Sequence, residues 1–311
     1  MKETHSVSLV LSGGGARGLA HIGAIHELED RGYQIRSVAG CSIGALVGSL
    51  YAVGMLDAYE RWIVGLDKLD ILKMIDFTLI DKGFIKGERI FEQMRKLNLI
   101  PKVNIEDLSI PFAAVAVDIM HNRETVFRSG NLEKAIRASI AIPLVFTPLY
   151  WNEEILVDGG VLNPLPLEHA IRTPGDLLVA IDLNAPIPYS PPVSIEKSGT
   201  IHRLVSKIED RAEEFGISAR RLKNLMKKWD EFFGQGNKER KIGTFELVMR
   251  SVQLMQNKLT SYALEKNPPD VLIPISKDSA TVFEFYRAEE LIQYGRDACA
   301  AALNRKQATQ A

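Results

Sequence analysis

Short apolar runs alternate with helical periodicity over the first fifty residues. Residues 7–11, apolar apart from Ser8, form a run that ends at a glycine cluster, which is typical of a buried central strand. Apolar side chains then recur at helical spacing over 19–28 and stop before Gly32, which predicts a helix with a glycine C-cap. Residues 35–39 predict a second strand, and 45–53 continue as an apolar helix rich in small residues. This order predicts an α/β fold whose two strand-to-helix turns lie at the same end of a parallel sheet.

The same patterns continue to the end of the chain. Helices are predicted over 55–75, 88–97, 132–139, through 247–255, and from 283 to about 303, with a frayed end after that. Strands are predicted at 111–117, 125–128, 155–157, 176–183 and 271–274. Pro143 and Pro148 frame an irregular apolar loop that either lines an acyl-chain groove or covers the core.

Residues 190–243 differ from the rest of the chain in composition. Residues 194–241 contain 12 Lys and Arg against 8 Asp and Glu, and residues 220–233 combine an apolar stripe with several basic side chains. Such a stretch is either a basic amphipathic helix that rests on anionic lipid or a helix packed on its own domain with a solvated outer face. We therefore predict one domain over 1–311 that carries a basic, largely helical insertion at about 190–243. Peripheral membrane contact through about 220–233 is the open alternative for this insertion.

Composition excludes several classes of partner. Charged residues make up 25% of the chain and the net charge is -1, so no global field argues for binding to nucleic acid. The two cysteines, Cys41 and Cys299, cannot build a disulfide framework and lack the spacing of metal ligands, which fits a reducing compartment. No signal peptide is evident, and no segment approaches the roughly 18 uninterrupted apolar residues of a membrane span. We expect a cytoplasmic protein whose contact with a membrane is at most peripheral.

The stretch Gly40-Cys41-Ser42-Ile43-Gly44 is the strongest candidate for chemistry. It joins a predicted strand to a predicted helix, and glycines two positions either side of Ser42 permit the close backbone approach of a strained elbow. Such a turn exposes the serine hydroxyl at a helix N-terminus, where free amides and the helix dipole favour developing negative charge. Ser42 is therefore a candidate nucleophile, although G-x-S-x-G also arises by chance in a chain with 23 glycines.

The glycine-rich turn before the first predicted helix has two interpretations. Gly13, Gly15 and Gly18 satisfy the dinucleotide-binding pattern G-x-G-x-x-G. The acidic residue that should follow at the end of the second strand is absent, which argues against a dinucleotide. In the alternative, the backbone N–H groups of Gly14 and Gly15 form an oxyanion hole over Ser42.

Arg17 lies in the first turn of the helix that follows. A cation there opposes the helix dipole, so it should have an anionic partner. The partner is either a substrate phosphate or a nearby carboxylate, and we favour the carboxylate.

A nucleophilic serine needs a base, and none of the six histidines is well placed to supply it. In α/β-hydrolases the serine elbow follows several strands and the histidine lies in a turn after an acid, whereas Ser42 follows the second predicted strand. His169 is the best of the histidine candidates. Asp158, which precedes Gly159 and Gly160 at a predicted strand end, is either a plain turn residue or the base for Ser42.

Four motifs together resemble, in their order along the chain, the bacterial type of patatin-like phospholipases. They are the turn Gly13-Gly14-Gly15-Ala16-Arg17-Gly18, the elbow Gly40 to Gly44, the run from Ala138-Ser139 through Pro143 and Phe146 to Pro148, and Asp158-Gly159-Gly160. They span about the first 165 residues, and residues 268–295 also resemble the end of bacterial members. The resemblance implies a three-layer α/β/α fold with a mostly parallel central sheet.

The resemblance also implies a serine lipid acyl hydrolase that uses a Ser-Asp dyad. Ser42 would attack the acyl ester of a phospholipid or related lipid, Asp158 would serve as the base, and a covalent acyl-enzyme would form. The implied oxyanion hole consists of Gly13, Gly14, Gly15, Arg17 and Gly18. We expect neither a metal nor a cofactor. The alternative function is a regulatory or membrane-associated interaction module with weak esterase activity.

Overall fold

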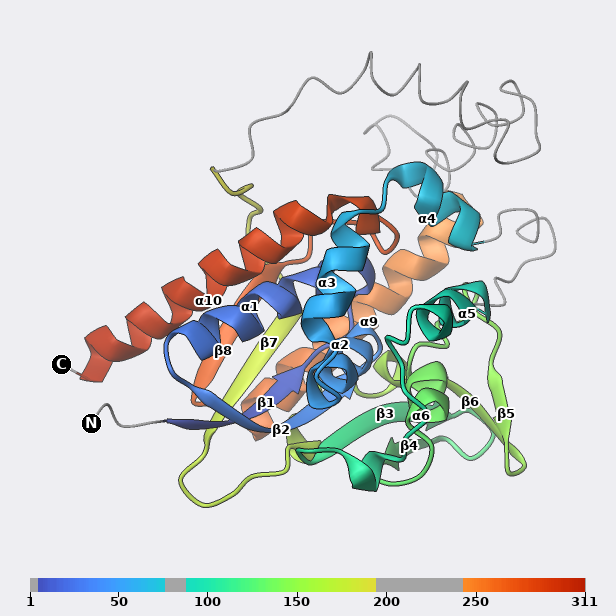
Figure 1. Cartoon of the computed structure of the whole chain (residues 1–311), viewed down its shortest axis with the longest axis horizontal. Helices are drawn as coiled ribbons and strands as arrows, with labels where there is room; N and C mark the ends of the chain where they lie inside the picture. Colours follow the sequence, from blue (N-terminus) through green and yellow to red (C-terminus); the bar gives the residue numbers. More distant parts are fainter. Residues whose placement is uncertain (1–4, 76–87, 194–242, 311) are drawn as a thin grey trace, which may run out of the picture.

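The computed structural model describes residues 5–75, 88–193 and 243–310, whose strands form one mixed sheet (Figure 1). The strand order is β5-β6-β3-β2-β1-β7-β8, and β4 pairs with β3. The bounds are β1 (Ser6–Leu11), β2 (Gln34–Cys41), β3 (Phe112–Asp118), β4 (Arg123–Phe127), β5 (Leu149–Trp151), β6 (Glu154–Asp158), β7 (Leu177–Ala185) and β8 (Val271–Ser276). Strands β3-β2-β1-β7-β8 pair in parallel, whereas β4 and β6 pair antiparallel with β3, and β5 with β6.

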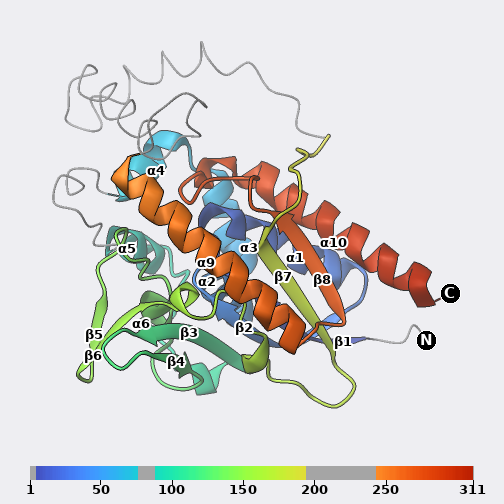
Figure 2. The ribbon, with the colours of Figure 1, turned by 180° about the vertical axis from the view of Figure 1, so that it is seen from behind.

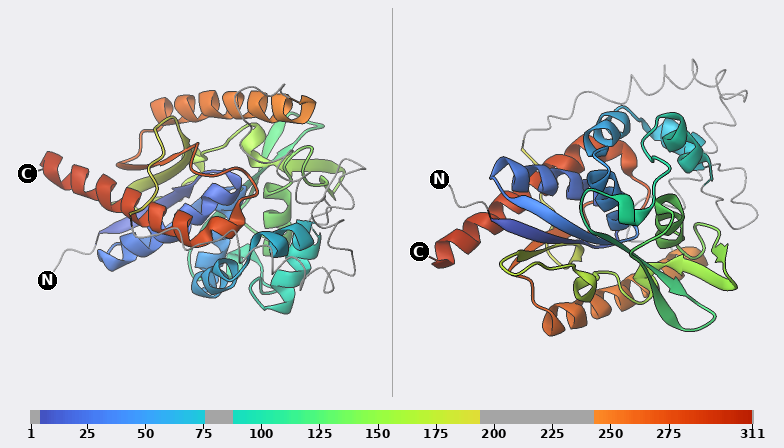
Figure 3. Two further views of the ribbon diagram at one scale, coloured as in Figure 1. Left: turned by 90° about the horizontal axis from the view of Figure 1, so that it is seen from above. Right: turned by 60° about the horizontal axis from the view of Figure 1, so that its bottom comes forward.

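Helices cover both faces of this sheet (Figure 2, Figure 3). One face carries α1, α2 and α10, and the other carries α9. The bounds are α1 (Leu19–Asp30), α2 (Ile43–Ala52), α3 (Leu56–Val64), α4 (Lys68–Ile75), α5 (Glu88–Lys96), α6 (Leu132–Ser139), α9 (Thr244–Lys266) and α10 (Ala288–Gln310). The predicted three-layer α/β/α fold is confirmed.

The two faces of the sheet divide the apolar side chains of each central strand between them. In β1, Leu9 and Leu11 belong to the large cluster under α1 and α2, whereas Val10 belongs to a smaller cluster that Leu264 of α9 covers. Alternation along a strand sends successive side chains to opposite faces. A strand buried on both faces is therefore mostly apolar, which explains the apolar run at residues 9–11 of β1; the buried Ser8 donates its hydroxyl to the Ile171 carbonyl at 3.1 Å.

Most of the predicted elements are confirmed, and α6 covers the same residues that the sequence pattern indicated. The glycine C-cap after α1 is confirmed as well. Gly32 has a φ of 81°, and the N–H of Tyr33 donates to the Leu28 carbonyl at 2.9 Å, which closes the helix end.

The single helix predicted over 55–75 is wrong, because two helices occupy this segment. Gly65 follows the last residue of α3, and α4 begins three residues later. The carboxylate of Asp67 accepts hydrogen bonds from the amides of Leu69 at 2.9 Å and Asp70 at 3.1 Å. Asp67 therefore caps a new helix rather than continuing the old one.

The predicted bounds of the closing helix are wrong at both ends. It begins at Ala288 rather than near 283, because the carbonyl of Val282 accepts a hydrogen bond from Ala16 at 3.0 Å and its segment stays in a loop. It continues to Gln310 instead of fraying near 303. The side chain of Arg31 donates to Asn304 at 2.7 Å and so ties the last turns of α10 to the end of α1.

The predicted insertion at about 190–243 lies outside the described residues except for its ends. The domain organisation and the membrane contact through 220–233 therefore stay predictions. Among the helices of the described ranges, none combines the length and the apolar character needed to cross a membrane.

Candidate active site

The carboxyl ends of β2 and β6 meet at one edge of β3. Cys41, the last residue of β2, pairs with Val115, and Asp158, the last residue of β6, pairs with Ala116. Strand β2 runs parallel to β3 and β6 antiparallel to it, while β4 occupies the other edge of the same stretch. The two strands therefore approach end to end. This arrangement brings together Ser42 and Asp158, which are 116 positions apart in the sequence.

Ser42 sits on a strained turn between β2 and α2. Its φ of 55° and ψ of −125° lie outside the regions that residues with a side chain favour. Its N–H donates to Ser139 Oγ at 2.9 Å, and the Ser139 hydroxyl donates to the Val115 carbonyl at 2.6 Å. A Cβ at Gly40 would lie 2.5 Å from the carbonyl carbon of Gly44, so strand and helix backbones touch at this elbow.

Asp158 has the geometry of a base for Ser42. The Ser42 hydroxyl donates to Asp158 Oδ2 at 2.5 Å, and the N–H of Gly160 donates to Oδ1 at 2.7 Å. A Cβ at Gly159 would lie 2.3 Å from the Val115 carbonyl oxygen, so the turn after Asp158 packs directly on β3. Burial raises the pKa of Asp158 to about 6, against the opposing effect of its hydrogen bonds. A carboxylate with a raised proton affinity is a better acceptor for a serine proton.

The glycine turn after β1 lies beside Ser42. A Cβ at Gly13 would lie 3.2 Å from the Cβ of Ser42. The amides of Gly14 and Gly15 donate no hydrogen bond to any group in the described part of the chain. Gly18 ends the short helix Gly15–Gly18 and packs against α2, where a Cβ would lie 2.2 Å from the Ile43 side chain. The turn therefore offers two free N–H groups near the serine.

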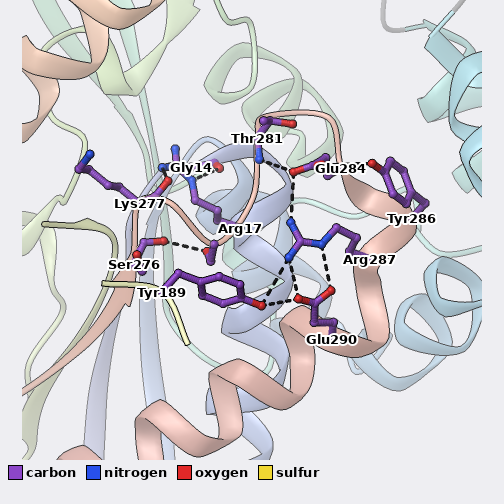
Figure 4. Close-up of polar contacts among 11 residues, drawn as sticks. Gly14, Arg17, Tyr189, Ser276, Lys277, Thr281, Glu284, Tyr286, Arg287 and Glu290 are labelled. Atoms are coloured by element: carbon purple, nitrogen blue, oxygen red, sulfur yellow. Dashed lines mark hydrogen bonds and ion pairs between the residues drawn. The ribbon is translucent and has the colours of Figure 1, made fainter. Parts of the chain in front are cut away.

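Arg17 donates to the backbone of this turn, and the carboxylate partner predicted for it is wrong. Its Nε donates to the Gly14 carbonyl at 3.0 Å and its Nη1 to the Lys277 carbonyl at 2.9 Å (Figure 4). No carboxylate of the described residues forms an ion pair with it; Asp182 and Asp278 act only at longer range. Burial lowers its pKa to about 10, and the two carboxylates oppose this, so the side chain stays charged at neutral pH. Two carbonyl oxygens satisfy the guanidinium instead of the expected anion.

An apolar cavity opens beside Ser42. The space in it, part of which is open to solvent, is about 760 Å³, and Gly15 and Ser42 form part of its wall. The other lining residues, all apolar or aromatic, are Ile43, Leu46, Tyr59, Trp62, Ile63, Ile71, Met74, Ile90, Met94, Ile140, Ile142, Phe146, Val282, Phe283 and Phe285. Phe146 belongs to the loop framed by Pro143 and Pro148, so this loop does line the cavity. Such a wall suits an acyl chain and offers little to a polar substituent.

The loop between β8 and α10 supplies three of the lining residues, and an ionic network braces it (Figure 4). Arg287 donates to both carboxylate oxygens of Glu290, at 2.6 and 2.9 Å, and to Glu284 at 3.2 Å. The hydroxyl of Tyr189 also donates to Glu290. The Thr281 amide donates to the same Glu284 oxygen at 2.7 Å, which ties the middle of the loop to this network.

Histidine 169 is not placed to serve Ser42. Its Nε2 lies 2.7 Å from Glu124 Oε2, and with Glu168 these residues form one of two groups in the described ranges whose atoms could surround a metal ion. The other group is His26, Asp57 and Glu60. Neither group includes Ser42 or Asp158, and the expectation of a metal-free reaction stays a prediction.

The sequence reasoning missed several parts of the site. Ser139 belongs to one of the four motifs, but the sequence does not indicate that its hydroxyl accepts a hydrogen bond from the Ser42 amide. The predicted closing helix begins at 283 and so includes Phe283 and Phe285, which in the structure precede α10 and line the cavity. Asn184, which donates to the Gly13 carbonyl at 2.8 Å, is the penultimate residue of the mostly apolar strand β7, and Asp158 is likewise at the carboxyl end of β6. That shared position, a polar residue at the carboxyl end of a central strand, could have identified it.

A serine elbow at the carboxyl edge of a mostly parallel sheet is typical of serine hydrolases. Residues 9–171 match the sequence model of the family described as patatin-like phospholipase. The chain therefore belongs to the patatin-like phospholipase family, whose members are lipid acyl hydrolases. The family predicted from the four motifs is confirmed, and with it the predicted lipid hydrolase function, whereas the role of the glycine turn stays a prediction.

Two relatives and one solved structure are similar to this chain to different extents. An uncharacterized NTE family protein of Mycobacterium tuberculosis is 32% identical over 332 residues, which cover 96% of this chain and 91% of that protein. A protein of Cryptococcus neoformans described as a lysophospholipase is 34% identical over 200 residues, which cover 60% of this chain and 12% of that protein. The crystal structure of VipD from Legionella pneumophila aligns with a TM-score of 0.47 at 16% identity, over 98% of this chain and 67% of that one.

Proposed function

We propose that this protein hydrolyses the acyl ester bond of a phospholipid or lysophospholipid through a Ser42-Asp158 dyad. The observation that carries the proposal is the 2.5 Å hydrogen bond from the Ser42 hydroxyl to a buried carboxylate beside an apolar cavity. The cavity accepts the acyl chain, and the name of the Cryptococcus neoformans relative supports a lysophospholipid among the substrates.

The reaction proceeds in two steps. Ser42 Oγ attacks the ester carbonyl carbon while its proton passes to Asp158 Oδ2, and the carbonyl oxygen becomes an oxyanion that accepts hydrogen bonds from Gly14 and Gly15. The alcohol leaves with the proton from Asp158, which gives the acyl-enzyme. A water molecule then attacks the acyl group and gives its proton to Asp158, and Ser42 Oγ leaves with that proton as the fatty acid is released.

A fluorophosphonate probe tests the nucleophile directly. The wild-type protein should gain the mass of one adduct, and peptide mapping should place it on Ser42, because the dyad and the free amides activate this hydroxyl. The Ser42→Ala variant should gain none. Ser49→Ala is the matched control: Ser49 is buried on the same helix and donates to its own helix at Leu46, so labelling should be unchanged. Folded wild-type protein that reacts elsewhere, or not at all, would remove Ser42 from the mechanism.

The pH dependence of hydrolysis should report Asp158. Only the deprotonated carboxylate can accept the serine proton, so kcat/KM should rise with pH through about 6 and become constant above about 7. The measurement is hydrolysis of an uncharged acyl ester between pH 4.5 and 8.5, with circular dichroism to show that the protein stays folded. A midpoint near 4, the usual range of an exposed aspartate, would contradict the effect of burial, and a flat profile would exclude Asp158 as the base.

A further inference from the structure

Two buried side chains hold consecutive carbonyl groups of the glycine turn. Asn184 Nδ2 donates to the Gly13 carbonyl at 2.8 Å, and Arg17 Nε donates to the Gly14 carbonyl at 3.0 Å. A trans peptide group is planar, and its N–H points opposite to its C=O. The N–H of Gly14 therefore points away from Asn184, and the N–H of Gly15 points away from Arg17.

Both N–H groups are left free for a substrate. Neither donates to a group in the described part of the chain, and Gly15 shares the wall of the apolar cavity with Ser42. On its other side the turn packs closely against β7, because a Cβ at Gly14 would lie 2.7 Å from the Leu183 side chain. The turn therefore contacts β7 on one side and borders the cavity on the other.

Hydrogen bonds fix the backbone at Asn184, although its side chain lowers the stability of the protein. Its N–H donates to Asp182 Oδ1 at 2.9 Å, and the preceding amide of Leu183 donates to Ser12 Oγ at 2.9 Å. Asn184 is 3% exposed, and its Oδ1 is buried without a hydrogen-bond partner. An unsatisfied buried polar atom destabilises a protein, so an apolar residue of similar shape would suit this position better for stability alone. Within the described residues, the one hydrogen bond that its side chain makes is the bond to the Gly13 carbonyl.

We propose that Asn184 is a positioning residue of the oxyanion hole: by holding the Gly13 carbonyl it aims the Gly14 N–H at the oxyanion formed over Ser42. This role rests on the function proposed above. Asn184 acts through the backbone and does not touch the substrate. Its contribution therefore grows as negative charge develops on the substrate oxygen, and it should affect kcat more than KM.

The test compares an acyl ester with the thionoester of the same acyl chain and leaving group. Sulfur is a weak hydrogen-bond acceptor, so an intact oxyanion hole favours the ester, and a misaligned one favours it less. In Asn184→Leu, which keeps the side-chain volume, we expect kcat for the ester to fall by about 10- to 100-fold with KM nearly unchanged. The ratio of kcat/KM values, ester over thionoester, should fall with it.

Two further variants separate positioning from stability. Asn184→Asp keeps the shape but has no N–H donor at pH 8, so it should lower the ratio in the same way even if Asn184→Leu folds poorly. Asn257→Leu is the matched control, because Asn257 also has a buried Oδ1 without a partner but lies on α9, and its ratio should equal that of the wild type. An unchanged ratio in folded, active Asn184 variants would overturn this role and leave the dyad intact. Absence of ester hydrolysis and of Ser42 labelling in the wild type would overturn both proposals.

Discussion

Replacing Asp158 by asparagine should lower kcat/KM for ester hydrolysis by about 1,000-fold or more, because the base that accepts the Ser42 proton is lost. The exchange is nearly isosteric. The asparagine oxygen can still accept from the Gly160 amide, and its nitrogen can donate to Ser42 Oγ, so both hydrogen bonds are retained and only the one with Ser42 is reversed in direction. Hydrolysis of a short-chain ester by purified wild type and variant measures the loss, and residual activity above about a tenth of wild type would contradict the role of Asp158.

The same variant should be more stable than the wild type at neutral pH. Below about pH 4 the carboxyl group is protonated in both the folded and the unfolded chain, and it contributes no difference. Between about pH 4 and pH 6 the unfolded chain releases the proton while the folded chain keeps it, so stability falls as pH rises. Above pH 6 the free energy of unfolding has fallen by its full amount. A rise of the Asp158 pKa by roughly two units on folding corresponds to a loss of about 3 kcal/mol. Asp158→Asn removes the carboxylate and with it this loss of stability.

Asp176→Asn is the matched control for this stability effect. Asp176 is also a buried carboxylate, but it accepts hydrogen bonds from the Thr173 amide at 2.9 Å and from the Ser8 hydroxyl at 3.2 Å. Burial raises the pKa of Asp176, yet its hydrogen bonds outweigh this and leave the pKa below its usual value. Urea unfolding at pH 5 and pH 7.5 should show Asp158→Asn stabilised and Asp176→Asn destabilised at the higher pH. The same sign for both variants would contradict this account of Asp158.

Gly44→Ala should disrupt the elbow and the fold around it. A Cβ at this position would lie 2.3 Å from the Leu11 carbonyl oxygen and 2.8 Å from that of Ser12. Both oxygens belong to the backbone at the end of the central strand β1, which neighbouring strands hold on both sides. The helix α2 must therefore move away, and we expect the free energy of unfolding to fall by at least about 3 kcal/mol. Fluorophosphonate labelling of Ser42 should be lost with it.

Gly65→Ala provides the comparison for this variant. Gly65 has a φ of −74°, which alanine adopts easily, and the nearest atom to an added Cβ is 3.4 Å away. Its replacement should leave stability unchanged or slightly raised. Thermal unfolding and labelling of the two variants in parallel measure the difference. Equal stability of Gly44→Ala and Gly65→Ala would show that α2 can move without cost, against the packing described here.

Local structure could be predicted from the sequence wherever one local cause dominates. The apolar run of β1 and the capped helix α6 are examples: Asn131 accepts from the Lys134 amide at 3.0 Å, as an N-cap residue should. Prediction failed where a distant contact decides the outcome. Helical periodicity covers Phe283, but the bond between Ala16 and the Val282 carbonyl keeps this segment in a loop at the cavity. Such a bond joins residues more than 260 positions apart and leaves no local pattern.

The sequence by itself determined the α/β order of the elements, the serine elbow and the glycine turn, because each depends on the conformations that neighbouring residues allow. It also identified Asp158 as a candidate base through the motif order of its family. Only the tertiary structure decided that Ser42 and Asp158 meet, since their contact depends on the pairing of β2 and β6 with one edge of β3. The cavity and the contact of Asn184 with the turn have the same origin. They arise from packing between elements far apart in the chain, which local residue patterns do not encode.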